Sequence, residues 1–327
     1  MADPVIKKQE PQPTLSHRLE LFGLKFLRAL LFAMPIDLAS WAMGKVWRLI
    51  GPLNVRHKRV LRHMSWALGD ETTASGRDKI AREMWENLGR TFAEALILDK
   101  IIRDQSRIQI DPAALSQWTE KGDKAAIFVS HHFGNWELNG VPALWHTNRA
   151  VMGVYKRVKN RLAENWIKSI RDDVYKGGLY TESDKPARTI VQQLRKGVSF
   201  AMICDLRDSR GIDVSLFDMP TKVSAFPTSL AVKVGLPVFL TQVRRTKGAN
   251  FILDMVQIKI EKSSDQNQEI EALTQACHTQ FEEWIKAHPE QWMWAPYRWK
   301  GRYENDDKPL SWDQFRARNE DDTQASS

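Results

Sequence analysis

The sequence predicts an α/β fold in which a mixed, mostly parallel central sheet is flanked by helices, with a helical region at the N-terminal end. Two observations support this prediction. From Ala125 onward, short apolar runs of strand length alternate with amphipathic stretches of helical length, which is typical of a sheet with helices packed on it. Ahead of these runs, helical patterns cover most of the first 103 residues.

The elements follow from the spacing of the apolar residues. The helical spacing predicts helices at 15–33, 36–50, 54–68 and 76–103. Apolar runs of about strand length predict strands at 125–130, 150–155, 198–204, 237–244 and 251–260. A helix is predicted after the first of these strands and ends at residue 146. Further helices are predicted at 159–175, 186–196, 225–234 and 267–287. The last of them has one apolar face, formed by Ile270, Leu273, Cys277, Phe281 and Trp284.

The chain divides into four parts by composition. Residues 1–14 are a polar leader predicted to be disordered, and residues 304–327 form a polar tail. Between them we expect a helical region at 15–103 and an α/β domain at 104–303, within a chain of 327 residues that can bury a sizeable core. The two cysteines, Cys204 and Cys277, form no spaced pair and are expected in the core, so nothing indicates an oxidising compartment.

Positive charge is concentrated at the N-terminal end. The formal net charge is +8, and residues 1–65 contain eleven Lys or Arg against four Asp or Glu. No helix-turn-helix, zinc-finger or RNA-binding motif accompanies this charge, so nucleic acid is not the expected partner. The same stretch is rich in Leu, Phe and Trp, and helices of this composition are typical of segments that lie in an anionic lipid interface.

The apolar run at the N-terminal end does not have the pattern of a transmembrane span. A helix that crosses a bilayer needs about 20 predominantly apolar residues, whereas this run is interrupted by Glu20, Lys25, Arg28, Pro35, Asp37 and Lys45. The leader also lacks the small-residue cleavage site of a signal peptide. We therefore expect amphipathic helices that attach to a membrane from one face. The alternative is an ordinary helix packed on the domain.

The most informative segment is HHFGNWE at residues 131–137, directly after a predicted strand. We predict a strand-to-helix turn here, with Gly134 permitting the bend and Asn135 as a potential N-cap. His132 at the strand end can then meet Glu137 in the first helical turn, where the helix dipole favours an ionised carboxylate. The pair is a candidate general base with its orienting group, and no nucleophilic Ser or Cys stands beside it.

Two other interpretations of this segment stay open. His and Glu side chains at a strand end often only satisfy hydrogen bonds. His131, His132 and Glu137 are also plausible metal ligands. However, their spacing is not the His-Glu-x-x-His pattern of a zinc helix, and no Cys pair or distant His cluster completes a ligand shell. We therefore expect no bound metal, and no cofactor is expected.

The string SHHFGNWE at residues 130–137, with its His-x4-Glu spacing, resembles the signature of the bacterial late lipid A acyltransferases, the lauroyl and myristoyl transferases of the lysophospholipid acyltransferase superfamily. Four more segments resemble stretches of this family in the same order, and they are Gly153–Gly178, Leu194–Asp208, Leu216–Arg245 and His288–Lys300. The resemblance runs from about residue 20 to residue 300.

The chain departs from the family pattern at two places. Many members have Phe-Phe-Gly where this chain has Leu216-Phe217-Asp218, and His-Arg-Arg often stands where this chain has Pro296-Tyr297-Arg298. Both departures lie away from His132 and Glu137. They therefore bear on the acyl-chain length and the acceptor rather than on the chemistry.

The resemblance implies a glycerolipid acyltransferase-like fold and a membrane-associated O-acyltransferase. It implies that a fatty acyl chain passes from an acyl thioester, with acyl carrier protein as the donor, to a hydroxyl of a lipid A precursor at the cytoplasmic face of the inner membrane. His132 would be the general base and Glu137 its orienting group. A lysophospholipid or other glycolipid acyltransferase is the neighbouring alternative. A non-catalytic lipid-binding protein of the same fold is an alternative of another class, although a binder has no need of a paired base.

Several polar residues are expected to contact the substrates. Lys156, Arg157 and Arg171 are candidates for positive charge near the developing oxyanion or the phosphates of the acceptor. Asn160 is a candidate hydrogen-bond partner, and Asn135 of the HHFGNWE segment is counted with this group. For each charged candidate, a solvated surface position is the alternative.

Two further candidates lie later in the chain. Asp205, at the end of an apolar strand, is expected to give polar support, because the ends of sheet strands border ligand crevices. Arg298 is a candidate contact for a lipid phosphate. The neighbouring Trp292, Trp294 and Trp299 are expected to be core and interface aromatics rather than ligands.

Overall fold

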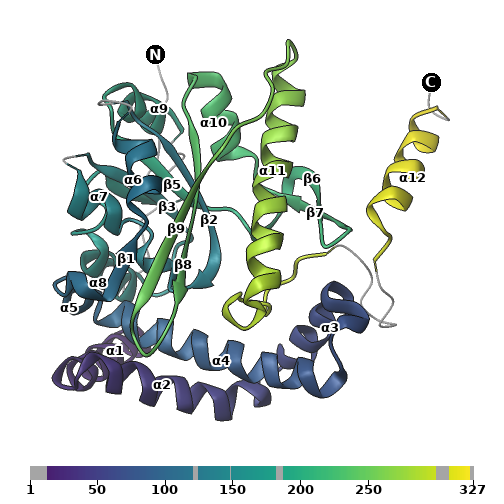
Figure 1. The fold of residues 1–327 in the computed structure, drawn as a ribbon. Coiled ribbons are helices and arrows are strands. Elements are labelled where there is room, and N and C mark those ends of the chain that lie inside the picture. The colour runs from purple at the N-terminus through teal and green to yellow at the C-terminus, as the bar shows by residue number, and fades with distance from the viewer. Residues whose placement is uncertain (1–12, 121–123, 148, 182–186, 300–308, 325–327) are drawn as a thin grey trace.

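The centre of the molecule is a seven-stranded sheet with the spatial order β1-β9-β8-β2-β5-β3-β4, shown in Figure 1. The computed structural model describes residues 13–120, 124–147, 149–181, 187–299 and 309–324. Its strands are β1 (Ile108–Ile110), β2 (Ile127–Gly134), β3 (Val151–Tyr155), β4 (Gly178–Thr181), β5 (Ser199–Ile203), β8 (Val238–Arg245) and β9 (Phe251–Ile258). All paired neighbours run parallel except β8 and β9. The predicted mixed, mostly parallel sheet is confirmed.

Helices form a layer below the sheet and cover both of its faces (Figure 1). The N-terminal layer consists of α1 (Leu15–Ala33), α2 (Ile36–Ile50), α3 (His57–Leu68), α4 (Ala74–Leu96) and α5 (Leu98–Ile101). The later helices are α6 (Pro112–Thr119), α7 (Val141–His146), α8 (Arg161–Arg171), α9 (Ala187–Arg195), α10 (Phe226–Val234), α11 (Gln266–Ala287) and α12 (Trp312–Gln324). A separate antiparallel hairpin joins β6 (Arg207–Leu216) to β7 (Met219–Val223).

The alternation of side chains along β2 explains why both faces of the sheet are covered. Ile127 and Val129 belong to one buried cluster, together with residues of α9, α10 and α11. Phe128 belongs to a second cluster, together with residues of α6, α7 and α8. A strand that is apolar on both sides must be buried on both sides, and this is why the run predicted at 125–130 lies in the middle of the sheet.

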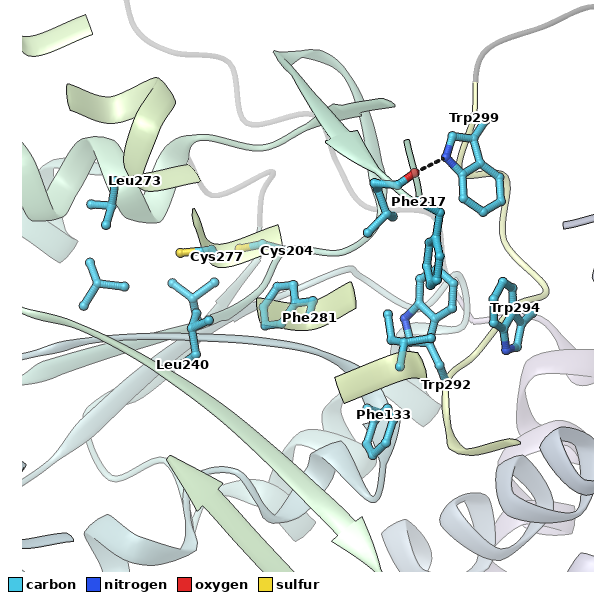
Figure 2. Close-up of a cluster of buried hydrophobic side chains, with 14 of the residues drawn as sticks. Phe133, Cys204, Phe217, Leu240, Leu273, Cys277, Phe281, Trp292, Trp294 and Trp299 are labelled. Carbon is cyan, nitrogen blue, oxygen red and sulfur yellow. Dashed lines mark hydrogen bonds between the residues drawn. The ribbon is translucent and has the colours of Figure 1, made fainter. Parts of the chain in front are cut away.

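The first cluster contains the aromatic residues of the closing segment (Figure 2). Trp292, Trp294 and Trp299 are all fully buried. The rings of Trp292 and Trp294 meet edge to face with centroids 4.6 Å apart, and the indole of Trp299 donates a hydrogen bond to the Leu216 carbonyl. Cys204 and Cys277 are buried in the same cluster. The prediction that these residues form core is confirmed.

The structure contains several elements that the sequence patterns do not predict. They are β1, α6, β4, the β6–β7 hairpin and α12, the last of which lies within the predicted polar tail. The helix predicted at 76–103 is interrupted at Ile97, whose φ of −117° and ψ of 28° separate α4 from α5. The predicted strand at 125–130 continues to Gly134. Most of the predicted leader, residues 1–12, lies outside the described residues.

The end of β2 is held by a close approach of two backbones. Gly134 has a φ of +53°, and a Cβ at this position would lie 1.8 Å from the carbonyl oxygen of Val243. The Gly134 carbonyl accepts hydrogen bonds from the hydroxyl of Thr91 at 2.7 Å and from the amide of Asn87 at 3.2 Å, both on α4. The position therefore requires glycine for space as well as for conformation.

We expect Gly134→Ala to destabilise the fold severely, by about 4 kcal/mol or more, because the backbone must move to admit the methyl group. Gly235→Ala is the matched control: Gly235 also has a positive φ, of +73°, but among the described residues no atom beyond its chain neighbours lies within 4 Å of the place that a Cβ would take there. Strain alone there costs about 1–2 kcal/mol. Urea unfolding of both variants measures the difference, and equal losses would refute the steric argument.

A buried ionic network ties the helical layer to the sheet. Glu94 of α4 is fully buried and accepts hydrogen bonds from the guanidinium of Arg245, at 2.5 and 2.8 Å, and from the hydroxyl of Ser40 on α2, at 2.6 Å. Its second oxygen also accepts from the amide of Asn135, at 2.8 Å. Removal of one partner would leave an uncompensated buried charge, which costs about 3–5 kcal/mol. The network fixes the turn after β2 against α2, α4 and β8.

Candidate active site

A cavity of about 560 Å³ lies on the sheet face that α7 and α8 cover. Strands across the sheet contribute to its wall, among them Met255 of β9, Thr241 of β8, Phe128 of β2, Ala201 of β5 and Val151 of β3. Its volume is within the range of about 300–1,000 Å³ that is usual for small-molecule sites. Phe128, Ser130 and His132 line it at alternate positions of β2, so the cavity extends along this strand to its carboxyl end.

His132 lies two residues before the end of β2, and its side chain is only 16% exposed. The Nδ1 atom of its ring lies 2.7 Å from Oδ1 of Asp205, and its backbone N–H donates to Oδ2 of the same carboxylate at 3.1 Å. The indole of Trp136 meets the ring at a steep angle, with centroids 5.2 Å apart. Two contacts of the ring, with Asp205 and with Trp136, therefore hold the imidazole on the cavity wall, and the backbone hydrogen bond fixes Asp205 beside it.

Asp205 is a buried carboxylate with two cationic or polar partners besides His132. Its Oδ2 accepts from the indole N–H of Trp292 at 2.8 Å and from the Arg298 guanidinium at 3.1 Å. Burial alone would raise the pKa of Asp205, but the charges of Arg298 and His132 and the hydrogen bond from His132 outweigh it and hold that pKa well below its usual range. Asp205 is therefore an ionised acceptor.

The ionisation of Asp205 decides the tautomer of His132. A carboxylate has no proton to donate, so Nδ1 of His132 must be the donor in their hydrogen bond. In the neutral ring, the lone pair is then on Nε2. His132 lines the cavity, so the structure holds on the cavity wall an imidazole whose neutral form has a single tautomer.

The sequence predicts that Glu137 contacts His132, but the carboxylate of Glu137 has another hydrogen-bond partner. Its carboxylate instead forms two hydrogen bonds with the guanidinium of Arg171 on α8, at 2.6 and 2.5 Å. The helical turn expected at Glu137 is a 3-10 turn, Trp136–Leu138, capped by Asn135 as predicted. The planar fork of an arginine fits a carboxylate at both oxygens, which a single imidazole nitrogen cannot do. The hydrogen bond to the His132 ring that the sequence predicts for Glu137 is made instead by Asp205.

Arg171 is brought to the cavity by the ion pair with Glu137, and both residues line its wall. Burial alone would lower the pKa of Arg171, but the charge of Glu137 and its hydrogen bonds outweigh burial and raise that pKa. The side chain of Tyr175 packs nearby in the wall, and burial raises its pKa well above the ordinary value. The site therefore combines an oriented imidazole with a fixed positive charge.

His131, the neighbour of His132, faces away from the cavity because successive side chains of a strand point to opposite sides. It is fully buried and stacks on the ring of Phe281, with centroids 4.4 Å apart. Burial lowers the pKa of His131 to about 3, with the charges of His132, Arg298 and His278 acting in the same direction and that of Asp205 opposing them. His131 is therefore a neutral core residue.

This burial makes the stability of the fold sensitive to acid. The unfolded chain binds a proton at His131 near pH 6.5, whereas the folded chain does so only near pH 3. As the pH falls between these values, the free energy of unfolding should decrease by about 1.4 kcal/mol per pH unit from this group. We expect His131→Phe to remove that part of the slope in urea unfolding between pH 6.5 and 4. An unchanged slope would contradict the assignment.

The two predicted asparagines hold structure together outside the cavity wall. Asn135 is buried between Glu94 and the backbone N–H of Glu137. Asn160 caps α8 through its carbonyl oxygen, and its amide donates to the His17 carbonyl at 2.9 Å and to Glu20 at 2.8 Å, both on α1. The structure thus gives both residues protein partners, and their expected contacts with a substrate stay predictions.

The remaining predicted cations are spread over three environments. Lys156 is exposed and lines the cavity. Arg157 lies outside the cavity wall, 3.4 Å from Glu164 and 3.3 Å from the hydroxyl of Thr181. Arg298 is 1% exposed and packs beneath Asp205 and over the ring of Trp292. The expected contact of Arg298 with a lipid phosphate stays a prediction, and in this structure its guanidinium is buried against the carboxylate of Asp205.

Sequence reasoning assigns no site role to Trp292, which donates a hydrogen bond to Asp205. The one signal in the sequence is that the closing aromatic segment contains both Trp292 and Arg298.

Within the described ranges, no group of three or more His, Cys, Asp or Glu residues is arranged to hold a metal ion.

Most of the chain matches a known protein family. Residues 8–301 match the family described as bacterial lipid A biosynthesis acyltransferase. No curated protein matches the chain at a significant level. The matched range includes the helical layer, the sheet, the cavity and the aromatic segment that carries Trp292 and Arg298. The chain therefore belongs to the bacterial lipid A biosynthesis acyltransferase family, and it is an acyltransferase.

Proposed function

We propose that this acyltransferase moves a fatty acyl chain from an acyl thioester carried by acyl carrier protein to a hydroxyl of a lipid A precursor, with His132 as the general base. The observation that carries the proposal is the hydrogen bond between Nδ1 of His132 and the ionised Asp205, at 2.7 Å, on the wall of a cavity. A thioester is already activated, so the protein has only to deprotonate the acceptor and stabilise the tetrahedral oxyanion.

The reaction uses one proton that His132 takes and returns. Nε2 of His132 accepts the proton of the acceptor hydroxyl. At the same time the hydroxyl oxygen attacks the carbonyl carbon of the thioester and forms the new C–O bond. The tetrahedral intermediate collapses, the C–S bond breaks, and His132 returns the proton to the departing thiolate. The products are an ester on the lipid and a free thiol on the carrier. Asp205 acts as a positioning residue that stabilises the transient imidazolium.

Arg171 is the group that we assign to the developing oxyanion. Its guanidinium lines the same cavity as His132, and two hydrogen bonds to Glu137 fix its position. A preorganised charge in a water-poor site stabilises a transition state without reorganisation. In this assignment Glu137 contributes to the reaction by holding Arg171 in place. Glu137 and His132 are close in the sequence, and both line the same cavity.

The apolar part of the cavity suits an acyl chain. Phe128 lies four residues before His132 on β2, about 13 Å deeper along the strand at roughly 3.3 Å per residue. Trp118 packs edge to face on Phe128, with centroids 4.9 Å apart, and both line the cavity together with Ala143 and Met255. The carbonyl carbon would therefore lie beside His132 and the tail would extend toward Trp118.

The N-terminal helices carry an exposed apolar stripe that supports attachment to the inner membrane from its cytoplasmic face. No helix within the described residues combines the length and the apolar character that crossing a bilayer requires. On α1, however, Leu15, Leu19, Phe22, Phe26 and Leu30 recur every three or four residues, and each is at least 46% exposed. Exposed apolar residues continue on α2 and beyond as Leu38, Trp41, Val46, Leu49, Ile50, Leu53 and Val55. Such a surface, flanked by basic residues, is typical of interfacial attachment.

The proposed reaction is tested by supplying both substrates to the purified protein in detergent or vesicles. Acyl carrier protein loaded with a fatty acid and a lipid A precursor with free hydroxyls should yield a lipid heavier by one acyl group, as measured by mass spectrometry. A lysophospholipid offered in parallel tests the neighbouring acceptor class. Transfer to the lysophospholipid alone, or no transfer from the carrier-bound thioester, would overturn the proposal.

Attachment through the stripe predicts that Phe22→Glu combined with Phe26→Glu releases the protein from anionic vesicles. Each change removes about 1.5–3 kcal/mol of apolar burial and adds a charge that an anionic surface repels by about 1 kcal/mol. Leu310→Glu is the matched control, since Leu310 is also exposed, at 41%, but lies just before α12. Vesicle flotation measures binding. Equal retention of the double variant and the control would place the membrane contact elsewhere.

A further inference from the structure

The wall of the cavity includes a bulge of the β6–β7 hairpin, which has no part in the proposed acyl transfer. In the β6–β7 ladder, Arg207 and Ile212 are both registered on Val223, so residues 208–211 loop out of the pairing. At the end of the loop, a Cβ on Gly211 would lie 1.8 Å from the Val223 carbonyl oxygen. The chain therefore leaves and rejoins the ladder at one point, and only glycine permits the closing contact.

The bulge brings charged residues to the wall of the cavity. Arg207, Asp208, Ser209 and Arg210 all line the cavity that His132 lines. Arg207 and Arg210 are exposed, with the Arg210 side chain 87% accessible, and Asp208 holds the turn by accepting the backbone N–H of Arg210 at 3.0 Å. The guanidinium of Arg210 is 3.9 Å from this carboxylate, a separation that leaves its fork open to another anion.

The charge of the mouth is positive. Among the described residues that line the cavity, Glu137 and Arg171 neutralise each other, which leaves Lys156, Arg207 and Arg210 against Asp208. Lys156 follows β3, whereas the two arginines come from β6, so the cations approach the mouth from different elements. Two planar guanidinium groups on one bulge are suited to an anion with several oxygens, which a phosphate ester provides.

We propose that Arg207 and Arg210, presented by the Gly211-closed bulge, bind a phosphate ester of a substrate at the cavity mouth. This inference rests on the proposed function, which places a reacting hydroxyl and thioester beside His132. The phosphate can belong to the sugar of the acceptor lipid or to the pantetheine arm of the carrier-bound donor. Asp208 opposes the same anion and therefore weakens the interaction while it shapes the turn.

Binding, measured without turnover, tests this proposal in the full-length His132→Ala protein. The ligands are two matched pairs: a phosphorylated lipid A disaccharide and its dephosphorylated form, and an S-acyl phosphopantetheine and the corresponding S-acyl pantetheine. Arg207→Gln combined with Arg210→Gln should lower the affinity for the phosphorylated ligand of one pair by about tenfold or more. The affinity for the unphosphorylated ligand of that pair should not change. The affected pair identifies the source of the phosphate.

Two further variants make the result specific. Arg195→Gln, at an exposed arginine on α9 outside the cavity wall, should have no effect. Asp208→Asn keeps the oxygen that caps the turn and removes the charge, so it should tighten phosphate binding and make that binding more sensitive to salt. Equal affinity for both members of each pair, or equal weakening of both by the double arginine variant, would overturn the proposal. Because no turnover is required, failure of the acyl-transfer assay would not obscure this outcome.

Discussion

Replacement of His132 by alanine should reduce acyl transfer by about a thousandfold or more, while the fold remains intact. General acid–base groups contribute about 10²–10⁴-fold to rate, and here the same ring both accepts and returns the proton. The side chain is partly exposed at the end of β2 rather than packed in a core, so truncation leaves no large cavity. Initial rates with carrier-bound donor and lipid acceptor measure the loss, which should be in the turnover rate rather than in binding.

Thermal unfolding of the same preparation is the control for His132→Ala. A midpoint close to that of the unmodified protein, together with unchanged binding of the acceptor, would show that only chemistry is lost. Full activity in folded His132→Ala protein would exclude His132 as the base.

Asp205→Asn should have the second largest effect, and it should reduce both activity and stability. An asparagine can present its N–H to Nδ1 of His132, which favours the wrong tautomer; loss of the equivalent charge in a serine protease triad costs about 10⁴-fold. The change also leaves the buried Arg298 without its counter-charge. Loss of one partner of a buried ion pair costs about 3–5 kcal/mol.

A second substitution separates the two effects of Asp205→Asn. Arg298→Met removes the unpaired charge, so the combination with Asp205→Asn should recover much of the free energy of unfolding but none of the catalytic rate. Recovery of activity together with stability would mean that Asp205 acts only through the fold. Urea unfolding and transfer rates on the four proteins complete the cycle.

The sequence predicts the sheet, and the position of His132 within it, because both depend on local patterns. A run that is apolar on both faces identifies β2, and the residue at its carboxyl end lies at the edge where an α/β sheet presents ligands. The short strands β1 and β4 have only three and four residues and carry no period long enough to recognise. The β6 strand contains Arg207, Asp208 and Arg210, which gives it the composition of a loop.

The partners of the site residues could not be predicted because they depend on competition between distant segments. The pairing of His132 with Glu137 relied on a separation of five residues in sequence. In the structure, Glu137 forms an ion pair with Arg171 of α8. His132 forms its hydrogen bond with Asp205, which follows β5, because β5 lies parallel beside β2 and ends at the same edge of the sheet. The register of β2 and β5 is a property of the tertiary fold, and a single sequence does not contain it.

The Glu94–Arg245 network has a consequence for the separability of the N-terminal helical layer. Glu94 belongs to the N-terminal helical layer and Arg245 to the central sheet, and together with Asn135 they fill one buried site. A shortened chain that began after this layer would expose the arginine and free the turn that follows His132. The helices are therefore part of the catalytic body rather than a detachable anchor, and solubility is better sought by altering their exposed stripe than by removing them.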